Sequence, residues 1–325
     1  MKAIVATGYG SPDVFTFKDV AKPKPKPNEI LLKVKTSAAT TADTMMRTGK
    51  PYFARLFLGL TKPNKPIPGT GFAGIVDEIG SSVTKFKKGD RVFGMTAFGF
   101  SANAEFTTVP EDGVVLHLDN HIDFTQAANF CDGHLTSYNF LKRLAKIQAG
   151  QKVLIIGASG ALGTSGVQIA KYFGAIVHGV CSPKNAALVL SLGTDKVIHY
   201  TSTDYTQTNE RYDVVYDSVG KSSFNKCKSI LTENGTYYTP VLTLPALFQM
   251  IKTSIIGGKK AVFEASGTNP PDKLRVLLAE VYAIYKEGKL KTVIDRQFAL
   301  EKLAEAHEYI DTGRKKGNVV MIHTQ

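Results

Sequence analysis

The order of apolar and polar residues in the middle of the chain predicts a strand, a tight turn and a helix in immediate succession, within residues 152–174. Residues 153–156 form a continuous apolar run, which is typical of a parallel strand covered on both faces. After the turn, apolar residues recur at a spacing compatible with a helix packed on a sheet, namely Leu162, Val167, Ile169, Ala170 and Phe173. Gly174 is placed to end this helix, so the helix is expected to begin within the glycines.

The glycines between this strand and this helix predict a site for an anion such as a pyrophosphate. A helix N-terminus offers unpaired backbone N–H groups and a partial positive charge. The usual dinucleotide fingerprint is Gly-x-Gly-x-x-Gly, whereas this chain has Ala158, Gly160 and Gly163 in that register, directly after Gly157. A tight turn in another α/β protein would also explain the glycines, but the flanking strand and helix favour a dinucleotide site.

Short strands and turn signals fill the chain up to about residue 122. Apolar runs predict strands at five places, namely Lys2–Ala6, 30–34, 75–79, 91–94 and 104–109. A polar stretch at 36–44 leads into a short helix around 43–47, and the prolines among the lysines at 22–27 predict an extended surface linker. The pattern predicts a compact β-rich domain with a barrel-like arrangement.

Strands and helices alternate in the second half of the chain, which predicts a parallel sheet. Further strands are expected at Ile176–Cys181, Lys196–His199, 213–217 and 235–240. A helix at 271–287 precedes a closing strand at 319–323, so the C-terminal piece is expected to return to the first domain. The apolar stretch 242–252 is interpreted as a helix that lines a substrate cleft or contacts another subunit, with core packing as an equal alternative.

The composition of the chain limits the number of domains, the compartment and the kinds of partner that can be expected. At 325 residues, with 43% hydrophobic and 21% charged side chains, the chain is long enough for two domains. Cys131, Cys181 and Cys227 are too scattered for a disulfide framework and suggest a reducing compartment. The apolar runs are too short to span a membrane and no signal peptide is evident, so a cytoplasmic protein without a membrane partner is expected. The net charge of +12 comes from dispersed lysines, which favours a solvated surface over a nucleic-acid partner.

Seven landmarks occur in order along almost the whole chain. They are GTGFAG at 69–74, FKKGDRVFG at 86–94, AEFTTVPED at 104–112, LTSYNFL at 135–141, GASGALGTSGVQIAK at 157–171, YDVVYDSVG at 212–220 and GKLKTVIDRQFALEKLAEAHEYI at 288–310. Each landmark is modest alone, but the seven in this order are specific. The chain resembles the medium-chain dehydrogenase/reductase superfamily, and within it the zinc-free quinone oxidoreductase type.

This resemblance implies an α/β fold with two domains. A Rossmann domain, which is a doubly wound parallel sheet that binds a nucleotide, is expected at 123–266. A GroES-like β-barrel catalytic domain is expected from both chain ends, at 1–122 and 267–325. The resemblance also implies an active site in the cleft between the domains and a homodimeric assembly.

The sequence departs from the zinc alcohol dehydrogenases of that superfamily. By resemblance, their catalytic zinc ligands would fall at Thr40, at Thr70 or Gly71, and at Cys131. Of these residues only Cys131 could bind zinc, and a catalytic zinc usually has three protein ligands. The four-cysteine loop of their structural zinc is absent, and His134, three residues after Cys131, is interpreted as a packed and hydrogen-bonded residue. We therefore expect no metal.

The residues that follow the strand Ile176–Cys181 predict a preference for NADPH. An NAD-preferring site normally has Asp or Glu about twenty residues beyond the glycine motif. This chain instead has CSPKN at 181–185, where Ser182 and Lys184 offer a hydroxyl and an ammonium to a 2′-phosphate and Asn185 adds a neutral donor. A lysine can also be an ordinary surface charge, but the five residues include no acid.

The remaining cofactor contacts come from the glycine turn and from the resemblance. The turn is expected to supply Ser159, Gly160, Ala161 and Leu162. By resemblance, Tyr200 approaches the 2′-phosphate, Asn318 lies near the nicotinamide, and Thr40, Tyr52 and Thr136 surround the nicotinamide or the substrate. Thr40 and Tyr52 are the catalytic candidates, and Tyr52 is the plausible side-chain proton donor, with water as the alternative.

These features predict an oxidoreductase that uses NADP(H) and transfers hydride to a quinone or an α,β-unsaturated carbonyl without zinc. A plain ketone would lack a Lewis acid to polarise its oxygen, whereas a conjugated acceptor needs only positioning and a proton. Two alternatives stay open. One is a zinc-type alcohol dehydrogenase, and the other is a non-catalytic NADPH-sensing or nucleic-acid-binding protein on the same fold.

Overall fold

The computed structural model describes residues 1–96 and 100–323, and the chain forms two compact units. The first unit comprises residues 1–132, 267–282 and 294–325, and the second comprises 133–266 and 283–293. These ranges differ from the predicted domains at two places. Residues 123–132 join the first unit, where Phe130 packs edge-on against Phe93 with ring centroids 5.2 Å apart. Residues 283–293 join the second unit, where the backbone N–H of Lys291 donates to Gln168 over 2.9 Å.

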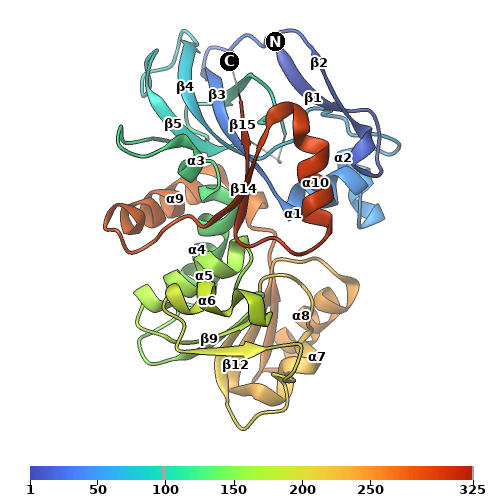
Figure 1. The fold of residues 1–325 in the computed structure, drawn as a ribbon, viewed down its shortest axis with the longest axis vertical. Coiled ribbons are helices and arrows are strands. Elements are labelled where there is room, and N and C mark those ends of the chain that lie inside the picture. The colour runs from blue at the N-terminus through green and yellow to red at the C-terminus, as the bar shows by residue number, and fades with distance from the viewer. Residues whose placement is uncertain (97–99, 324–325) are drawn as a thin grey trace. The chain divides into compact units, whose positions relative to one another are not determined.

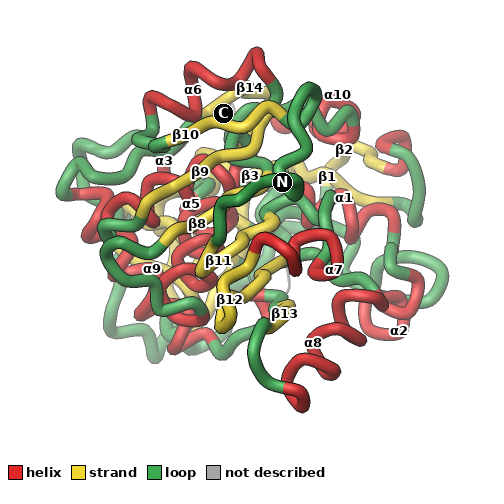
Figure 2. Tube along the Cα trace, turned by 90° about the horizontal axis from the view of Figure 1, so that it is seen from below, coloured by secondary structure: helices red, strands yellow, loops and turns green. Residues whose placement is uncertain are grey.

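The second unit is built on a six-stranded parallel sheet in the order β10-β9-β8-β11-β12-β13. Its strands are β8 (Lys152–Ile156), β9 (Ile176–Cys181), β10 (Lys196–His199), β11 (Tyr212–Asp217), β12 (Leu231–Thr239) and β13 (Lys260–Phe263). Figure 2 shows them side by side in this order. Numbered along the chain from β8, the order is the 3-2-1-4-5-6 of a Rossmann fold, which confirms the predicted parallel sheet.

Apolar residues explain why this sheet is buried. Val153, Leu154 and Ile155 of β8 are fully buried, as a central strand covered on both faces requires. The helices of the unit are α4 (Thr136–Tyr138), α5 (Ala161–Tyr172), α6 (Ala186–Ser191), α7 (Phe224–Cys227) and α8 (Leu244–Ile256). Two π-helical stretches, Phe130–Leu135 and Asn139–Leu144, flank α4.

The first unit is built on a seven-stranded sheet in the order β14-β15-β3-β4-β5-β7, with β6 paired to β3. Its strands are β3 (Glu29–Ala39), β4 (Gly71–Ile79), β5 (Arg91–Met95), β6 (Phe106–Pro110), β7 (Val114–His117), β14 (Ile294–Ala299) and β15 (Asn318–Ile322). A hairpin of β1 (Lys2–Ala6) and β2 (Phe15–Asp19) adds a second sheet. This β-rich unit agrees with the predicted GroES-like domain.

β3 organises the first unit because it is long enough to pair with three strands. β4 pairs along one edge, while the other edge pairs with β6 at its beginning and with β15 at its end. The C-terminal strand therefore lies beside the N-terminal part of the chain (Figure 1), as predicted. The prediction ended this strand at 34, but it continues to Ala39 because the polar residues are buried and bonded. Thr36 donates to the carbonyl of Phe124 over 2.8 Å, and Ser37 donates to Asn103 over 2.7 Å.

Helices complete the fold around this sheet. They are α1 (Thr41–Thr48), α2 (Arg55–Leu58), α3 (Phe124–Ala127), α9 (Pro271–Lys286), which continues into the second unit, and α10 (Leu303–Asp311). In the described part of the chain, none of the helices combines the length and the apolar character that crossing a membrane would require.

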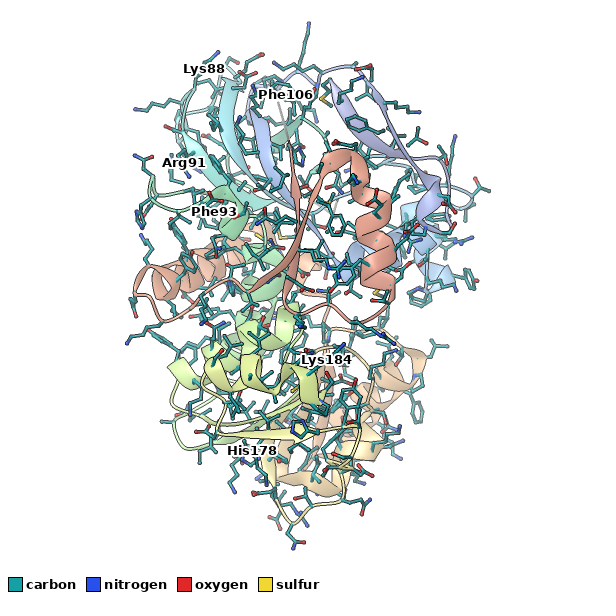
Figure 3. All side chains as sticks on the ribbon, viewed as in Figure 1. Lys88, Arg91, Phe93, Phe106, His178 and Lys184 are labelled. Carbon is teal, nitrogen blue, oxygen red and sulfur yellow. The ribbon has the colours of Figure 1, made fainter. Side chains whose placement is uncertain are left out.

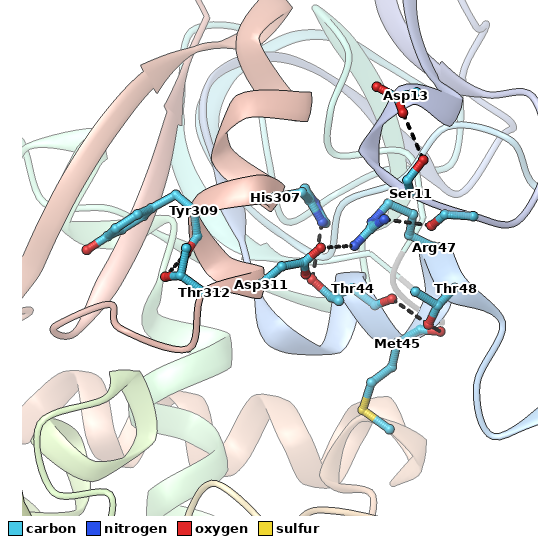
Figure 4. A network of polar contacts seen from close by, with 11 residues as sticks. Ser11, Asp13, Thr44, Met45, Arg47, Thr48, His307, Tyr309, Asp311 and Thr312 are labelled. Carbon is cyan, nitrogen blue, oxygen red and sulfur yellow. Dashed lines mark hydrogen bonds and ion pairs between the residues drawn. The ribbon is translucent and has the colours of Figure 1, made fainter.

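A buried arginine ties α1 to α10 (Figure 4). The guanidinium of Arg47 is 2% exposed, and it donates to the carbonyl of Gly10 and to the carboxylate of Asp311, each over 2.6 Å. On the same two helices, Thr44 Oγ1 lies 3.3 Å from Nδ1 of His307. Because a buried charge that loses its partner is costly, these bonds hold the two helices in register.

Candidate cofactor site

The glycine turn between β8 and α5 takes its shape from Gly157. Its φ of +80° lies in the left-handed region, which favours glycine. This conformation falls one residue before Ala158, so alanine is tolerated at the first position of the fingerprint. A Cβ on Gly163 would come within 2.1 Å of the carbonyl oxygen of Gly157, so the last glycine permits the close approach of helix and turn.

The first turn of α5 is open to an anion. Gly160 is the N-cap residue, so this position has no side chain that could cap the helix, and the first turn carries no acidic residue. The backbone N–H groups of Ala161 and Leu162 precede the first intrahelical bonds and are available to a ligand. The strand, turn and helix thus occur as predicted, and their geometry fits a pyrophosphate.

Ser182 and Tyr200 begin neighbouring turns at the same edge of the sheet. Parallel pairing places Cys181 of β9 opposite His199 of β10, and Ser182 and Tyr200 are the next residues of the two strands. The backbone N–H of Tyr200 donates to the carbonyl of Cys181 over 3.4 Å. Lys184, labelled in Figure 3, is exposed two residues after Ser182. Fold topology therefore brings the predicted phosphate-binding residues to the carboxyl edge of the strands, next to the glycine turn.

A buried hydrogen bond joins the turn after β8 to the turn after β9. Nδ2 of Asn185 donates to Oγ of Ser159 over 2.9 Å, and both side chains are buried. Because Ser159 accepts this bond, its hydroxyl proton can be donated to a phosphate. Within the described residues, Oδ1 of Asn185 is buried without a hydrogen-bond partner, and a ribose hydroxyl would satisfy it. The pair therefore fits a nucleotide that presents both a phosphate and a ribose.

Thr136 lies beside this site because its helix is tied to α5. Oγ of the adjacent Ser137 donates to the carbonyl of Leu162 over 2.8 Å. This bond joins α4 to the first turn of α5, and Thr136 itself is half-buried. The structure thus brings Thr136 together with the glycine turn, while its contact with a nicotinamide stays a prediction.

In the first unit, Thr40 is the N-cap residue of α1 and forms a capping box with Asp43. Oγ1 of Thr40 accepts from the backbone N–H of Asp43 over 3.1 Å and donates to its carboxylate over 2.9 Å. The backbone N–H of Thr40 and the hydroxyl of Thr70 also donate to this carboxylate, over 2.8 Å and 3.3 Å. Burial raises the pKa of Asp43 to about 7. The Thr40 hydroxyl is therefore hydrogen-bonded to a carboxyl group whose pKa lies near neutral pH.

The side chains at the superfamily's zinc positions do not fit a metal. Thr40 and Thr70 both direct their hydroxyls at Asp43. Burial raises the pKa of the Cys131 thiol far above its usual range, which disfavours the thiolate that binds zinc. Within residues 1–96 and 100–323, no three His, Cys, Asp or Glu side chains gather in a way that could hold a metal ion.

His134 is a packed and hydrogen-bonded residue, in agreement with its interpretation from the sequence. Its Nδ1 lies 2.9 Å from Oγ of Ser165, and its Nε2 lies 3.0 Å from Oγ1 of Thr292. Burial lowers the pKa of His134 to about 3, so the ring is neutral at physiological pH. Both ring nitrogens are therefore engaged within the second unit.

We predict that chelators leave the activity of the protein unchanged. The physical reason is the donor set, since two threonine hydroxyls and one protonated thiol bind Zn²⁺ weakly. Elemental analysis of the purified protein should find zinc well below one ion per chain. Activity that is lost to a chelator and restored by zinc would contradict this prediction.

Tyr52 and Asn318 also lie in the first unit. Tyr52 begins the short helical turn Tyr52–Ala54 and is exposed, with the guanidinium of Arg55 4.9 Å and the ammonium of Lys50 5.9 Å from the centre of its ring. Asn318 is buried at the start of β15, opposite Ile294 of β14. The roles of Tyr52 and Asn318 stay predictions.

Two residues of these sites are missing from the set predicted by sequence. Asp43 could have been found, because a threonine followed three residues later by an acid matches the capping-box pattern. Asn185 was noted as a neutral donor, but no pattern in the sequence indicates that it bonds to Ser159, since 26 residues separate them.

Comparisons with known proteins agree with this geometry. Residues 26–119 match the alcohol dehydrogenase GroES-like domain, and residues 192–321 match a family described as zinc-binding dehydrogenase. The chain is 32% identical to 2-methylene-furan-3-one reductase of Solanum lycopersicum, over 99% of this chain and 79% of that protein. It is 30% identical to the chloroplastic NADPH-dependent alkenal/one oxidoreductase of Arabidopsis thaliana, with the same coverage.

A solved structure extends the likeness to the whole fold. The quinone oxidoreductase from Coxiella burnetii superimposes with a TM-score of 0.89 at 28% identity, over 100% of this chain and 99% of that chain. Both units, the Rossmann strand order and the glycine turn are accounted for by one family. The chain belongs to the medium-chain dehydrogenase/reductase superfamily, among its quinone oxidoreductase-like members.

Proposed function

We propose that this protein is an NADPH-dependent oxidoreductase that transfers hydride to a quinone or an α,β-unsaturated carbonyl without zinc. The observation that carries this proposal is the turn after β9, where Ser182 and Lys184 occur without a carboxylate beside the bonded pair Asn185 and Ser159. A 2′-phosphate is strongly anionic, so this turn favours NADPH over NADH. A relative that is 30% identical is named as NADPH-dependent.

Different residues of the chain bind different parts of the cofactor. When bound, NADPH supplies the hydride from its nicotinamide ring. The backbone N–H groups of Ala161 and Leu162 bind the pyrophosphate, and Ser182 with Lys184 binds the 2′-phosphate. Tyr200 borders the same phosphate. Thr136, Asn318 and Thr40 orient the nicotinamide or the substrate, as the superfamily resemblance implies.

A conjugated acceptor suits the chemistry of these side chains. The zinc positions hold threonines whose hydroxyls donate to Asp43, so a substrate oxygen meets no Lewis acid there. Quinones and enones accept hydride without such polarisation because they delocalise the added charge. The names of the compared proteins, a quinone oxidoreductase, an alkenal/one oxidoreductase and a methylene-furanone reductase, agree with this class. Tyr52 is proposed to donate the proton.

The test is an acceptor screen that follows the absorbance of NADPH with purified protein. Oxidation of NADPH by quinones, enals or enones is the expected result. Turnover of simple alcohols with NADP⁺, dependent on added zinc, would instead indicate a zinc-type alcohol dehydrogenase. Binding of NADPH without oxidation by any acceptor would indicate a non-catalytic sensor on this fold.

We also propose a homodimer that forms through α8. One side of α8 packs beside β13, where the backbone N–H of Ala261 donates to Thr253 over 3.0 Å. The helix also exposes large apolar residues at helical spacing, namely Leu244, Phe248, Ile251 and Ile255. A second copy of the chain would cover this stripe, and sedimentation of the purified protein measures the assembly.

The compartment is proposed to be the cytoplasm. Cys131, Cys181 and Cys227 are all buried, and none of the three is part of a disulfide. Free thiols suit a reducing compartment, where disulfides do not persist.

A further inference from the structure

Residues 50–65 of the first unit carry a cluster of exposed apolar side chains. Leu56, Phe57 and Leu60 are 71%, 84% and 69% exposed, and Phe53 is exposed beside them. We call these four residues the apolar platform. A single exposed apolar residue is ordinary, but four within eight positions form a patch that indicates a binding surface.

The platform is held in place by the rest of the first unit. The hydroxyl of Tyr9 donates to the carbonyl of Gly59 over 2.7 Å. Arg55 donates to the carbonyl of Gly49 over 3.2 Å, and its guanidinium lies 4.4 Å from the centre of the Tyr9 ring. The backbone N–H of Asn64 donates to the carbonyl of Leu58 over 2.7 Å. The four apolar side chains are therefore displayed by a bonded scaffold and are not exposed by a loose loop.

The charged side chains of the segment that carries the platform are all positive. Lys50, Lys62 and Lys65 are exposed within the same segment. Along the sequence, Asp43 and Asp77 are the nearest acidic residues on either side, so the segment contains no carboxylate. Apolar and aromatic side chains bordered by lysines match the composition of segments that lie in the interface of a membrane.

We propose that the apolar platform binds the surface of an anionic lipid bilayer. Phe57, Leu56 and Leu60 would enter the boundary between head groups and acyl chains, while the bordering lysines contact anionic head groups. The sequence predicts no membrane partner because its apolar runs are too short to span a bilayer, but interfacial binding needs no such run. This proposal goes beyond the reductase activity and does not depend on it.

The charge pattern favours lipid over a second copy of the chain at this surface. Two platforms brought together would place like charges of Lys50, Lys62 and Lys65 side by side, without an acid in the segment to offset them. The stripe on α8 differs, because Lys252 is the only charged residue of that helix. The sparse charge of α8 thus suits a second copy, while the lysines beside the platform suit an anionic surface.

The experiment is co-sedimentation of the full chain with vesicles of phosphatidylcholine alone or mixed with phosphatidylglycerol. We expect binding to the anionic vesicles only, and weaker binding as salt rises. Phe57→Ser combined with Leu60→Ser should weaken this binding roughly tenfold or more. Lys62→Gln combined with Lys65→Gln should weaken it by a similar factor, taking about one kcal/mol per cation near such a surface.

The matched control is Leu190→Ser combined with Val276→Ser, which removes exposed apolar side chains outside both the platform and the proposed dimer contact and should leave vesicle binding unchanged. None of the residues substituted in the two platform variants is proposed to contact cofactor or substrate, so NADPH oxidation by a water-soluble acceptor should persist in these two variants. Absence of vesicle binding in the wild-type chain would overturn the proposal. Platform variants that bind vesicles normally but change the oligomeric state would also overturn it, because the platform would then contact a second copy. Platform variants that bind vesicles normally but lose turnover would overturn it too, because the platform would then contact the substrate.

Discussion

Replacing Ser182 by aspartate is expected to invert the cofactor preference from NADPH to NADH. Ser182 directly follows β9, next to Lys184 and beside the turn that holds Ser159. An aspartate there would repel the 2′-phosphate and would accept hydrogen bonds from the ribose hydroxyls of NADH. The measurement is the dissociation constant of each cofactor, from the fluorescence of the bound dihydronicotinamide.

Lys184→Ala tests the same site by removing the attraction between the lysine ammonium and the 2′-phosphate. A charge-assisted contact to phosphate contributes about 1.5 to 3 kcal/mol, so NADPH binding should weaken roughly ten- to a hundredfold while NADH binding hardly changes. The matched control is Lys196→Ala. It removes the same charge from the first residue of β10, at the amino ends of the strands and not at their carboxyl ends. A wild-type protein that prefers NADH, or a Lys184→Ala variant that loses both cofactors equally, would show that the 2′-phosphate binds elsewhere.

The Rossmann half of the fold could be predicted from the sequence because its signals are local. The run at 153–156 is apolar at every position, and the glycines follow it within the same short segment. Even the alanine at the first fingerprint position has a local explanation, since the left-handed conformation falls on Gly157. The order of the strands was not predicted, because the preference for right-handed crossovers fixes the hand of each connection and not the order.

The parts that could not be predicted depend on contacts between residues far apart in the chain. β3 continues past the expected end because Phe124 and Asn103 satisfy its polar residues. Residues 283–293 join the Rossmann unit through Gln168, which no periodicity in that segment indicates. Burial of a polar group is favourable only where a partner exists, and the partner is visible only in three dimensions.

Replacing Tyr52 by phenylalanine is expected to lower the turnover of enones roughly ten- to a thousandfold. The upper part of this range overlaps the usual contribution of general acid catalysis. Hydride addition to an enone leaves an enolate whose carbon must receive a proton. The Tyr52 hydroxyl can supply it, and the guanidinium of Arg55 and the ammonium of Lys50 lie beside its ring. The affinity for NADPH should stay the same, because the phosphate-binding residues are untouched.

Quinones provide the internal comparison for this variant. A reduced quinone carries its negative charge on oxygen, which water protonates rapidly, so Tyr52→Phe should slow quinones much less than enones. Tyr172→Phe is the matched control, since it removes a hydroxyl that bonds to Glu287 at the surface of the second unit. If enones and quinones slow equally, Tyr52 acts by positioning the acceptor, and if neither slows, water delivers the proton. The ratio of the two rates in wild type and variant therefore separates proton donation from packing around the substrate.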